Sequence, residues 1–266
     1  MKDVIVNNKL RAGMVISTYF PVWGGAQRQL YQIGKYLLEQ KVELFILTRH
    51  LPGTKSYEKI GGIDVYRVFV TNRFRILDSL LYTFLSLLWL VKNRRRFDIL
   101  HCYQIYSPTS IAVLAKKLLR KIKVVVKVTA SNEYGETKEI IRLPFTNLRI
   151  KLLNNVDKFL VVNRHMEKEL TVLGIPSSRI EYIPNGVEIP EESSFQPEVK
   201  SRFRKLLGLN FKKIAIFTGR LSEEKCLDTL LLSWSRVCSK LHLEAHLIIL
   251  GEGGKERNVE KKMTIS

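Results

Sequence analysis

Residues 99–128, ILHCYQIYSPTSIAVLAKKLLRKIKVVVKV, form the clearest strand–helix–strand unit in the sequence. Its two ends, Ile99–Cys102 and Val124–Val128, are short and mostly apolar runs, which are typical of buried β-strands. Between them, Thr109–Leu119 carries apolar residues at helical spacing. Two apolar strands joined by a helix predict a βαβ unit, the building block of a parallel sheet.

The same alternation continues on both sides of this unit. Further strands are predicted at 13–17, 42–48, 63–70, 158–162 and 180–183. Further helices are predicted from residue 26 to about 37, and over 76–91, about 138–154 and 164–173. Pro144 should start, kink or break the third of these helices. Strands that alternate with helices, several of them continuously apolar, predict a doubly wound α/β domain with a parallel sheet covered on both faces.

The turn-rich segment PNGVEIP at 184–190 marks the predicted domain boundary. We expect one domain at 1–186 and the beginning of a second at 187–266. In the second, strands are predicted at 213–218 and 245–250, and helices at 201–207 and 227–239. Two parallel strands with their crossover do not complete a sheet, and an independent domain usually has roughly 100–150 residues. The second domain is therefore expected to be incomplete.

The chain of 266 residues has 44 lysines and arginines against 25 acidic residues, a formal charge of +19. This excess implies an anionic partner: nucleic acid, anionic lipid headgroups or a phosphorylated small molecule. Nucleic acid fits least well, because no zinc-finger spacing or RNP-type motif is present. The three cysteines, Cys102, Cys226 and Cys238, lie far apart and favour a reducing compartment. Since the N-terminus lacks the apolar stretch of a signal peptide, we expect a cytoplasmic protein.

The most apolar stretch, Ile76–Val91 (ILDSLLYTFLSLLWLV), is flanked by basic residues on both sides. It is too short for a spanning helix and contains Asp78. Two alternatives remain: a helix buried in the core with solvated charges at its ends, or a helix lying in a bilayer interface with basic flanks against phosphates. The flanking residues are Arg73, Arg75, Lys92, Arg94, Arg95 and Arg96.

Three strand-to-helix turns carry residues suited to phosphate. Gly24 and Gly25 open the first helix, where free N–H groups and a positive dipole end favour an anion, although a tight turn alone also explains glycine. Arg220 and Lys225 bracket the turn after strand 213–218 and could neutralise a diphosphate, although a solvated charged loop is the simpler alternative. A third turn, Gly251–Glu252–Gly253, resembles a dinucleotide fingerprint only in part.

Other polar residues follow strands where substrates bind in parallel sheets. Ser131 and Asn132 come after the strand at 124–128 and are candidate contacts of an acceptor. His101, at the end of the strand at 99–102, is a third candidate, with a structural histidine as the alternative. The five histidines show no metal-ligand spacing, so no metal site is expected.

Taken in order, these segments resemble the retaining glycosyltransferases of family 4, which have the GT-B fold. The resemblance covers almost the whole chain. It rests on YFP and GGAQR within 19–28, FDILH at 97–101, IPNGVE at 183–188, FTGRLSEEKCL at 217–227 and LIILGEG at 247–253.

The resemblance implies a GT-B-like α/β fold, with a complete N-terminal Rossmann-like domain on the acceptor side and the first part of a nucleotide-sugar-binding domain. Gly24, Gly25, Arg220 and Lys225 match the family's residues around the donor diphosphate, and Gly219, Gly251, Glu252 and Gly253 match supporting loops. The implied reaction moves a sugar from a nucleotide-diphosphate donor to a glycan or lipid-linked acceptor with retention, without a cofactor or obligatory metal. Cell-surface polysaccharide synthesis at the inner face of the cell membrane is the expected setting. No catalytic residue is assigned.

The sequence departs from the family pattern at three places. Cys226 follows Lys225 where the family usually has glycine, which should be tolerable if the backbone there is helical. Ala130–Ser131–Asn132 stand near the place of the family's histidine. The family's paired-glutamate motif is expected beyond Gly253, where this sequence has none. From this we expect a fragment with weak or no activity alone, or alternatively a non-catalytic binding module derived from such an enzyme.

Overall fold

The computed structural model describes residues 9–132, 135–143, 145–192, 196–210, 213–242 and 245–254. Pro144 and the side chain of Arg75 lie outside the described part of the chain. The chain divides into two compact units, Met1–Gly186 and Val187–Ser266, and each is described by itself. Within the described ranges, no helix is both long and apolar enough to cross a membrane.

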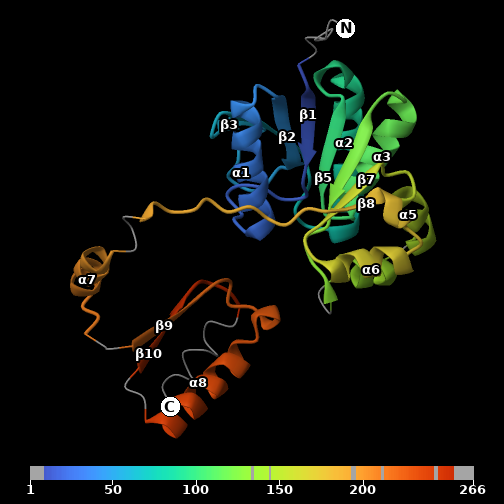
Figure 1. Cartoon of the computed structure of the whole chain (residues 1–266). Coiled ribbons are helices and arrows are strands. Elements are labelled where there is room, and N and C mark those ends of the chain that lie inside the picture. The colour runs from blue at the N-terminus through green and yellow to red at the C-terminus, as the bar shows by residue number, and fades with distance from the viewer. Residues whose placement is uncertain are drawn as a thin grey trace, which may run out of the picture. The chain divides into compact units, whose positions relative to one another are not determined.

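Unit 1 is built on an eight-stranded sheet (Figure 1). Neighbouring strands are parallel except for β3, which pairs antiparallel with β4. The parallel α/β sheet expected from the sequence is therefore confirmed, and β3 is an edge strand that the sequence analysis missed. In sheet order the strands are β3 (Tyr57–Ile60), β4 (Ile63–Val68), β2 (Glu43–Arg49), β1 (Arg11–Val15), β5 (Ile99–Tyr103), β6 (Lys123–Lys127), β7 (Lys158–Val161) and β8 (Ile180–Tyr182).

The helices of unit 1 connect successive strands of the sheet. Where one helix was predicted at about 138–154, the structure has two: α4 ends at Arg142 and α5 begins at Thr146. The helices are α1 (Gly25–Glu39), α2 (Arg75–Lys92), η1 (Arg94–Arg96), α3 (Ser107–Leu119), α4 (Glu136–Arg142), α5 (Thr146–Leu153), α6 (Arg164–Val172) and η3 (Ser177–Arg179).

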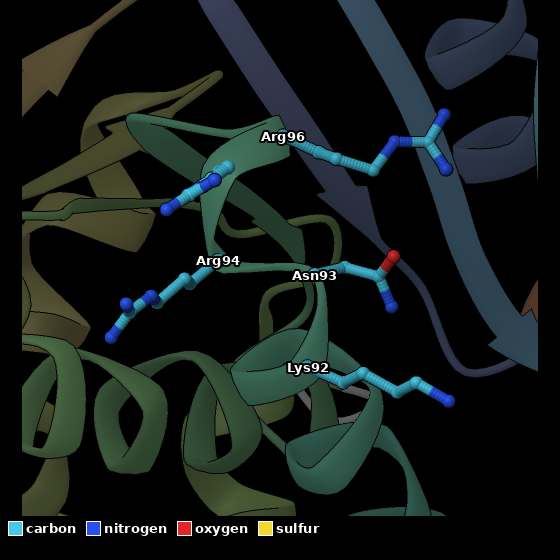
Figure 2. Close-up of a pocket in the computed structure, with 5 residues that line it drawn as sticks. Lys92, Asn93, Arg94 and Arg96 are labelled. Atoms are coloured by element: carbon cyan, nitrogen blue, oxygen red, sulfur yellow. The ribbon is translucent and has the colours of Figure 1, made fainter.

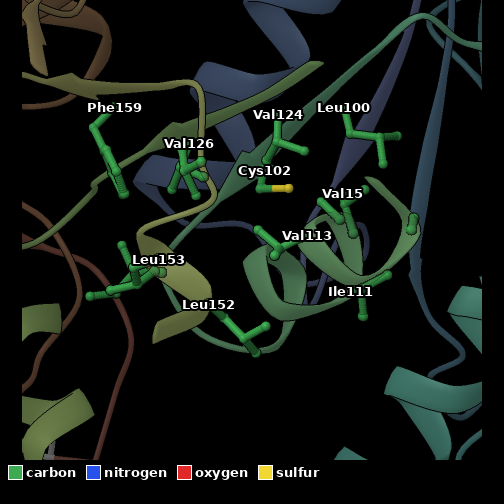
Figure 3. Packing of buried hydrophobic residues seen from close by; sticks show 14 of the residues in the cluster. Val15, Leu100, Cys102, Ile111, Val113, Val124, Val126, Leu152, Leu153 and Phe159 are labelled. Atoms are coloured by element: carbon green, nitrogen blue, oxygen red, sulfur yellow. The ribbon is translucent and has the colours of Figure 1, made fainter. Parts of the chain in front are cut away.

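The two faces of the sheet are covered by different helices. One face packs against α2, α3, α5 and α6 in a single large apolar cluster. Figure 3 shows part of this cluster, with Cys102 and Val124 of the sheet near Val113 of α3. The other face packs against α1 in a second cluster that contains Met14 and Leu30. Covering of both faces agrees with the continuously apolar strands.

Unit 2 contains a parallel pair of strands, β9 (Lys213–Thr218) and β10 (Ala245–Leu250), at the predicted positions. Its helices are α7 (Pro197–Leu206), η5 (Glu223–Lys225) and α8 (Leu227–Leu241). Leu221 and Leu227 are buried, and Phe217 and Ile249 pack against them. This small cluster holds the turn between β9 and α8 against the two strands.

Gly13 on β1 shows how tightly the strands of unit 1 are packed. A Cβ atom at this position would lie 2.6 Å from Cζ of Phe45 and 2.9 Å from Cδ2 of Leu100, both in the core. We predict that Gly13→Ala lowers the free energy of unfolding by about 1–3 kcal/mol, because the core cannot admit the extra methyl without moving these side chains.

Urea unfolding of unit 1 measures this effect. Gly25→Ala is the matched control, since no atom lies within 4 Å of a Cβ built there. Equal stability of the two variants would contradict the packing argument.

Candidate functional site

The turn between β1 and α1 leaves the N-terminus of α1 open. Gly24 precedes the first residue of the helix, no side chain caps it, and the first turn contains no acidic residue. The first N–H groups of α1 therefore have no side-chain partner, and the positive end of the helix dipole is not neutralised. A Cβ at Gly25 would meet nothing within 4 Å, whereas one at Gly24 would lie 2.9 Å from Oε1 of Gln27. Gly25 thus leaves space in which an anion can approach the backbone.

A buried arginine holds the base of this turn. The side chain of Arg67, on β4, has no exposed surface and pairs with Glu58 at 2.5 Å. Its guanidinium donates to the carbonyl of Phe20 at 2.9 Å and to that of Lys55 at 3.0 Å. Removing this group would leave the half-buried carboxylate of Glu58 and two carbonyls without this partner. Arg67 therefore positions the turn that carries Gly24, although it lies on another strand.

Side chains of the turn add further contacts. The amide of Gln27 donates to the carbonyl oxygen of Thr18 at 3.1 Å and to its hydroxyl at 3.3 Å. The ring of Trp23 lies 5.8 Å from that of Tyr31 on α1 and 6.1 Å from that of Phe20. These contacts fix the turn while its glycines stay open.

The loops after β5 and β6 share one buried carboxylate, that of Glu136. Its Oε2 accepts from the N–H of Ile105 at 2.7 Å. Its Oε1 accepts from the N–H and the hydroxyl of Thr129 at 2.6 and 2.7 Å. Burial raises the pKa of Glu136, and these hydrogen bonds oppose that shift. Glu136 sits at the start of α4 and ties two neighbouring strand ends together.

The candidate acceptor residues Ser131 and Asn132 follow directly. Asn132 has a backbone φ of +65°, a conformation that asparagine tolerates better than most residues. Its N–H donates to Glu169 of α6 at 2.9 Å, and the same carboxylate accepts from Thr137 at 3.0 Å. Asn132 is exposed and Ser131 half-buried. Both follow β6 and therefore lie at the carboxyl edge of the sheet.

His101 lies in the middle of β5, which continues to Tyr103, rather than at a strand end. Its Nε2 is buried without a hydrogen-bond partner. Burial, and then the nearby charge of Lys127, lower the pKa of His101 to about 4, so the ring is neutral at pH 7. Its ring centroid lies 4.9 Å from that of Tyr103. This placement separates His101 from the edge where Ser131 and Asn132 lie.

In unit 2, Arg220 and Lys225 lie on the exposed turn between β9 and α8. The guanidinium of Arg220 donates to Glu224 at 2.7 Å, and its side chain is 70% exposed. An exposed pair of this kind contributes at most about 1 kcal/mol, so an anionic ligand can replace Glu224 at little cost. Lys225 is exposed and has no ion-pair partner within the described ranges. The turn presents two positive groups with a buried leucine, Leu221, between them in sequence.

The glycines after β10 support this turn by allowing close backbone approach. A Cβ at Gly251 would lie 1.8 Å from the carbonyl oxygen of Gly219, and one at Gly253 would lie 2.4 Å from that of Leu221. The N–H of Gly219 donates to the carbonyl of Leu250 at 3.0 Å, and that of Leu221 donates to Glu252 at 2.9 Å. Packing between two loops therefore explains the GEG sequence without a bound phosphate.

Cys226 is not helical, contrary to the condition under which the sequence analysis considered it tolerable. Its φ and ψ are 48° and 43°, in the left-handed region, at the residue before α8. This region costs an L-residue roughly 1–2 kcal/mol, and glycine adopts it freely. The glycine usual at this position of the family thus has a backbone reason, and cysteine here carries strain.

The candidate residues fall into two groups, one in each unit. In unit 1, the Gly24–Gly25 turn and the Ser131–Asn132 loop lie at the carboxyl edge of the same sheet. In unit 2, hydrogen bonds bring Gly219 and Leu221, on either side of Arg220, against the Gly251–Gly253 turn.

The sequence analysis missed the residues that position these loops, namely Arg67, Glu136 and Glu169. Arg67 could have been identified as a charged residue inside an apolar strand. Glu136 could have been identified as an acidic residue at the start of a helix that follows a strand.

Comparison with known proteins agrees with this architecture. The model of the family described as Glycosyltransferase Family 4 matches residues 23–190. A phosphatidylinositol N-acetylglucosaminyltransferase subunit of Arabidopsis thaliana is 25% identical over 260 residues, which are 95% of this chain and 54% of that protein. The chain thus spans about half the length of this curated relative.

Two solved structures show the same fold at low sequence identity. HepE of Anabaena, in complex with UDP and glucose, matches with a TM-score of 0.70 and 15% identity, over 96% of this chain and 66% of that one. The catalytic domain of starch synthase IV from Arabidopsis thaliana, bound to ADP and acarbose, matches with a TM-score of 0.67 and 13% identity, over 97% and 71%. These likenesses confirm the α/β fold of GT-B type.

Gly251→Ala tests the packing of the two loops in unit 2. Because the clash is with a backbone oxygen, no side chain can move to relieve it, and we predict a loss of about 3 kcal/mol in the stability of unit 2. Hydrogen exchange of the β9 and β10 amides measures this loss. Gly254→Ala is the control, since a Cβ there meets no atom within 4 Å. Similar exchange in both variants would refute the close approach.

Cys226→Gly should stabilise unit 2 by about 0.5–1 kcal/mol, since relief of the left-handed strain exceeds the entropy cost of glycine. We expect the amides of α8 to exchange more slowly in Cys226→Gly than in the unaltered chain. Cys238→Gly, inside α8, should have the opposite effect by about 1 kcal/mol. Faster exchange in both variants would show that Cys226 is unstrained.

Proposed function

Because the chain belongs to Glycosyltransferase Family 4, whose model matches residues 23–190, we propose that it transfers a sugar from a nucleotide-diphosphate donor to a glycan or lipid-linked acceptor. The observation that carries the donor part of the proposal is the exposed Arg220–Lys225 turn at the carboxyl end of β9. Ligands of open α/β sheets bind at this end of the strands. HepE, which has the same fold, was solved with UDP and glucose, and this supports a nucleotide sugar as the donor.

In this proposal Arg220 and Lys225 bind the diphosphate, and Arg220 exchanges its bond to Glu224 for a phosphate oxygen. A guanidinium can donate two parallel hydrogen bonds to phosphate, and the lysine adds a second charge. Both would stabilise the negative charge that grows on the phosphate as the sugar departs. In unit 1, Gly24 and Gly25 at the open N-terminus of α1 offer backbone N–H groups suited to a phosphate.

The sugar is transferred with retention of configuration, in keeping with the family resemblance. The departing phosphate assists the acceptor's attack, and no cofactor or metal is required. A hexosyl-type sugar agrees with the name of the curated relative, part of an N-acetylglucosaminyltransferase. Ser131 and Asn132, on the acceptor side, contact the acceptor from the loop that Glu136 and Glu169 hold in place.

The acceptor is bound to a membrane, and the enzyme acts as a peripheral protein on the cytoplasmic face in the synthesis of a cell-surface polysaccharide. The name of the curated relative contains phosphatidylinositol, which supports a lipid acceptor for this chain. The high positive charge of the chain supports binding to an anionic membrane surface. The basic flanks of Ile76–Val91 are the segment expected to meet it.

Donor binding tests the proposal directly. Calorimetric titration with UDP, ADP and GDP should find one nucleotide that binds the full chain. Arg220→Ala and Lys225→Ala should each weaken it by about 10–100-fold, because each removes charge-assisted hydrogen bonds to phosphate. Glu224→Gln should leave affinity equal or higher, because Arg220 then has no competing carboxylate.

Arg236→Ala and Lys240→Ala, two exposed basic residues of α8, are the matched controls and should bind like the unaltered chain. The bound nucleotide's sugar derivatives are then offered with membrane lipid extracts, and the anomeric configuration of any product is determined. Unchanged nucleotide affinity in the Arg220→Ala and Lys225→Ala variants would contradict the assigned site. Failure to bind any of the three nucleotides would favour the non-catalytic binding module.

A further inference from the structure

Helix α2 turns its polar side chains inward. Asp78, Tyr82 and Ser86 lie on one side of the helix and are buried. The carboxylate of Asp78 accepts from the N–H and the hydroxyl of Thr71 at 2.6 and 2.7 Å. The hydroxyl of Tyr82 donates to the carbonyl of Ile16, just after β1, at 2.9 Å. The inner face of α2 is thus held to unit 1 partly by polar contacts.

The outer face of α2 is apolar and exposed. Six of its side chains are 37–72% exposed, and their spacing of one, three, four, four and three residues keeps them on one side of the helix. A surface helix normally has the reverse arrangement, with polar residues toward water. We call this set the α2 apolar face: Ile76, Leu77, Leu80, Phe84, Leu88 and Val91. The structure thus excludes a helix wholly buried in the core, because such a helix would bury these residues.

Basic side chains lie at both ends of the α2 apolar face. Arg73 precedes the helix, Lys92 is its last residue, and Arg94 and Arg95 follow it. None of the four is buried, and no carboxylate pairs with them in the part of the chain that the structure describes. Arg96 differs, since it donates to the hydroxyl of Tyr66 at 2.6 Å and lies 3.5 Å from Asp64.

The basic end after α2 also forms a hollow. Residues 92–96 line an open depression of about 380 Å³. Figure 2 shows Lys92, Asn93 and Arg96 extending to one side of it and Arg94 to the other. Positive groups around an open depression leave it accessible to the phosphate of a lipid headgroup.

We propose that α2 is an in-plane membrane anchor: its apolar face enters an anionic bilayer at the headgroup boundary, and Arg73, Lys92, Arg94 and Arg95 bind headgroup phosphates at its two ends. An apolar stripe bounded by basic residues is the arrangement of helices that lie in an interface. At about 1.5 Å per residue, α2 reaches across several headgroups. The inference rests on the proposed function and deepens it, because it names the surface that brings the enzyme to a lipid-linked acceptor.

The position of α2 links this anchor to the acceptor side. The helix begins after β4, at the carboxyl edge of the sheet where the Gly24 turn and the Ser131 loop also lie. The exposed rings of Phe69 and Phe74 lie in the same connection. The N-terminal end of α2, with Arg73, therefore lies at the edge at which an acceptor would be presented, and its C-terminal end leads back to the start of β5.

Charge argues against a second copy of the chain as the occupant. In a symmetric pair of α2 helices, the basic ends of one helix would meet those of the other. The positive groups at these ends would repel. An anionic bilayer complements both the apolar face and the basic ends, so we assign it as the partner of α2.

Sedimentation with liposomes tests the anchor, and it does not depend on catalysis. The full chain should bind vesicles of phosphatidylcholine and phosphatidylglycerol at low salt, and bind pure phosphatidylcholine vesicles far more weakly. A triple variant, Lys92→Gln with Arg94→Gln and Arg95→Gln, should bind anionic vesicles about 100-fold more weakly. A second, Leu80→Ser with Phe84→Ser and Leu88→Ser, should lose binding by at least as much.

Matched controls remove the same chemistry elsewhere on unit 1. Lys117→Gln with Lys121→Gln and Lys168→Gln removes three positive charges, and Tyr36→Ser with Leu148→Ser and Val172→Ser removes three exposed apolar groups. Both should bind vesicles within about threefold of the unaltered chain, and circular dichroism should show all variants folded.

Vesicle binding that survives either α2 variant would overturn the anchor. So would a dimer in lipid-free solution that the serine variant dissociates, since the apolar face would then belong to a second copy. If the chain binds vesicles as expected but binds no nucleotide, the anchor stands and the proposed transferase function fails.

Discussion

The carboxylate of Glu136 is the contact on which the carboxyl edge of the large sheet depends. At this edge the strands end, and the N–H groups of the following loops lose their ladder partners. One oxygen of Glu136 takes the N–H of Ile105 after β5, and the other takes that of Thr129 after β6. Because the group is buried, losing either bond would leave an unsatisfied polar atom at a cost of about 1–3 kcal/mol. The loop with Ser131 and Asn132 takes its position from this contact.

Charged residues therefore serve two different purposes, and solvation separates them. Arg67 and Glu136 are buried, and their hydrogen bonds fix loops of unit 1. Arg220 and Lys225 are exposed, and the pairing of Arg220 with Glu224 is weak enough to be exchanged. A buried charge cannot leave its partner without a large penalty, whereas an exposed one can. The exposed groups are thus the ones able to meet an incoming diphosphate.

Apolar runs predicted most strands of the fold, because a strand buried on both faces needs little else. β3 was missed because YEKI alternates exposed and half-buried residues at the sheet edge, although Gly61–Gly62 after it forms a hairpin turn. The outward direction of the α2 apolar face also escaped prediction, since periodicity cannot say which side of an almost wholly apolar helix meets the core. The glycine turns and the Arg220 turn were located from the sequence. Arg67 and Glu136, whose partners are backbone groups far along the chain, were not.

The glycines show why a motif needs geometry before it can be assigned a ligand. Gly251 and Gly253 match a family motif, yet a neighbouring carbonyl already forbids a side chain at each of them. Their presence is explained by packing and says nothing about phosphate. At Gly25 no described atom would touch a Cβ, so packing gives no reason for glycine there. The helix that follows has neither a capping side chain nor an acidic residue in its first turn. Packing within the protein therefore does not explain Gly25, and the open helix start beside it is the feature on which the proposed anion contact rests.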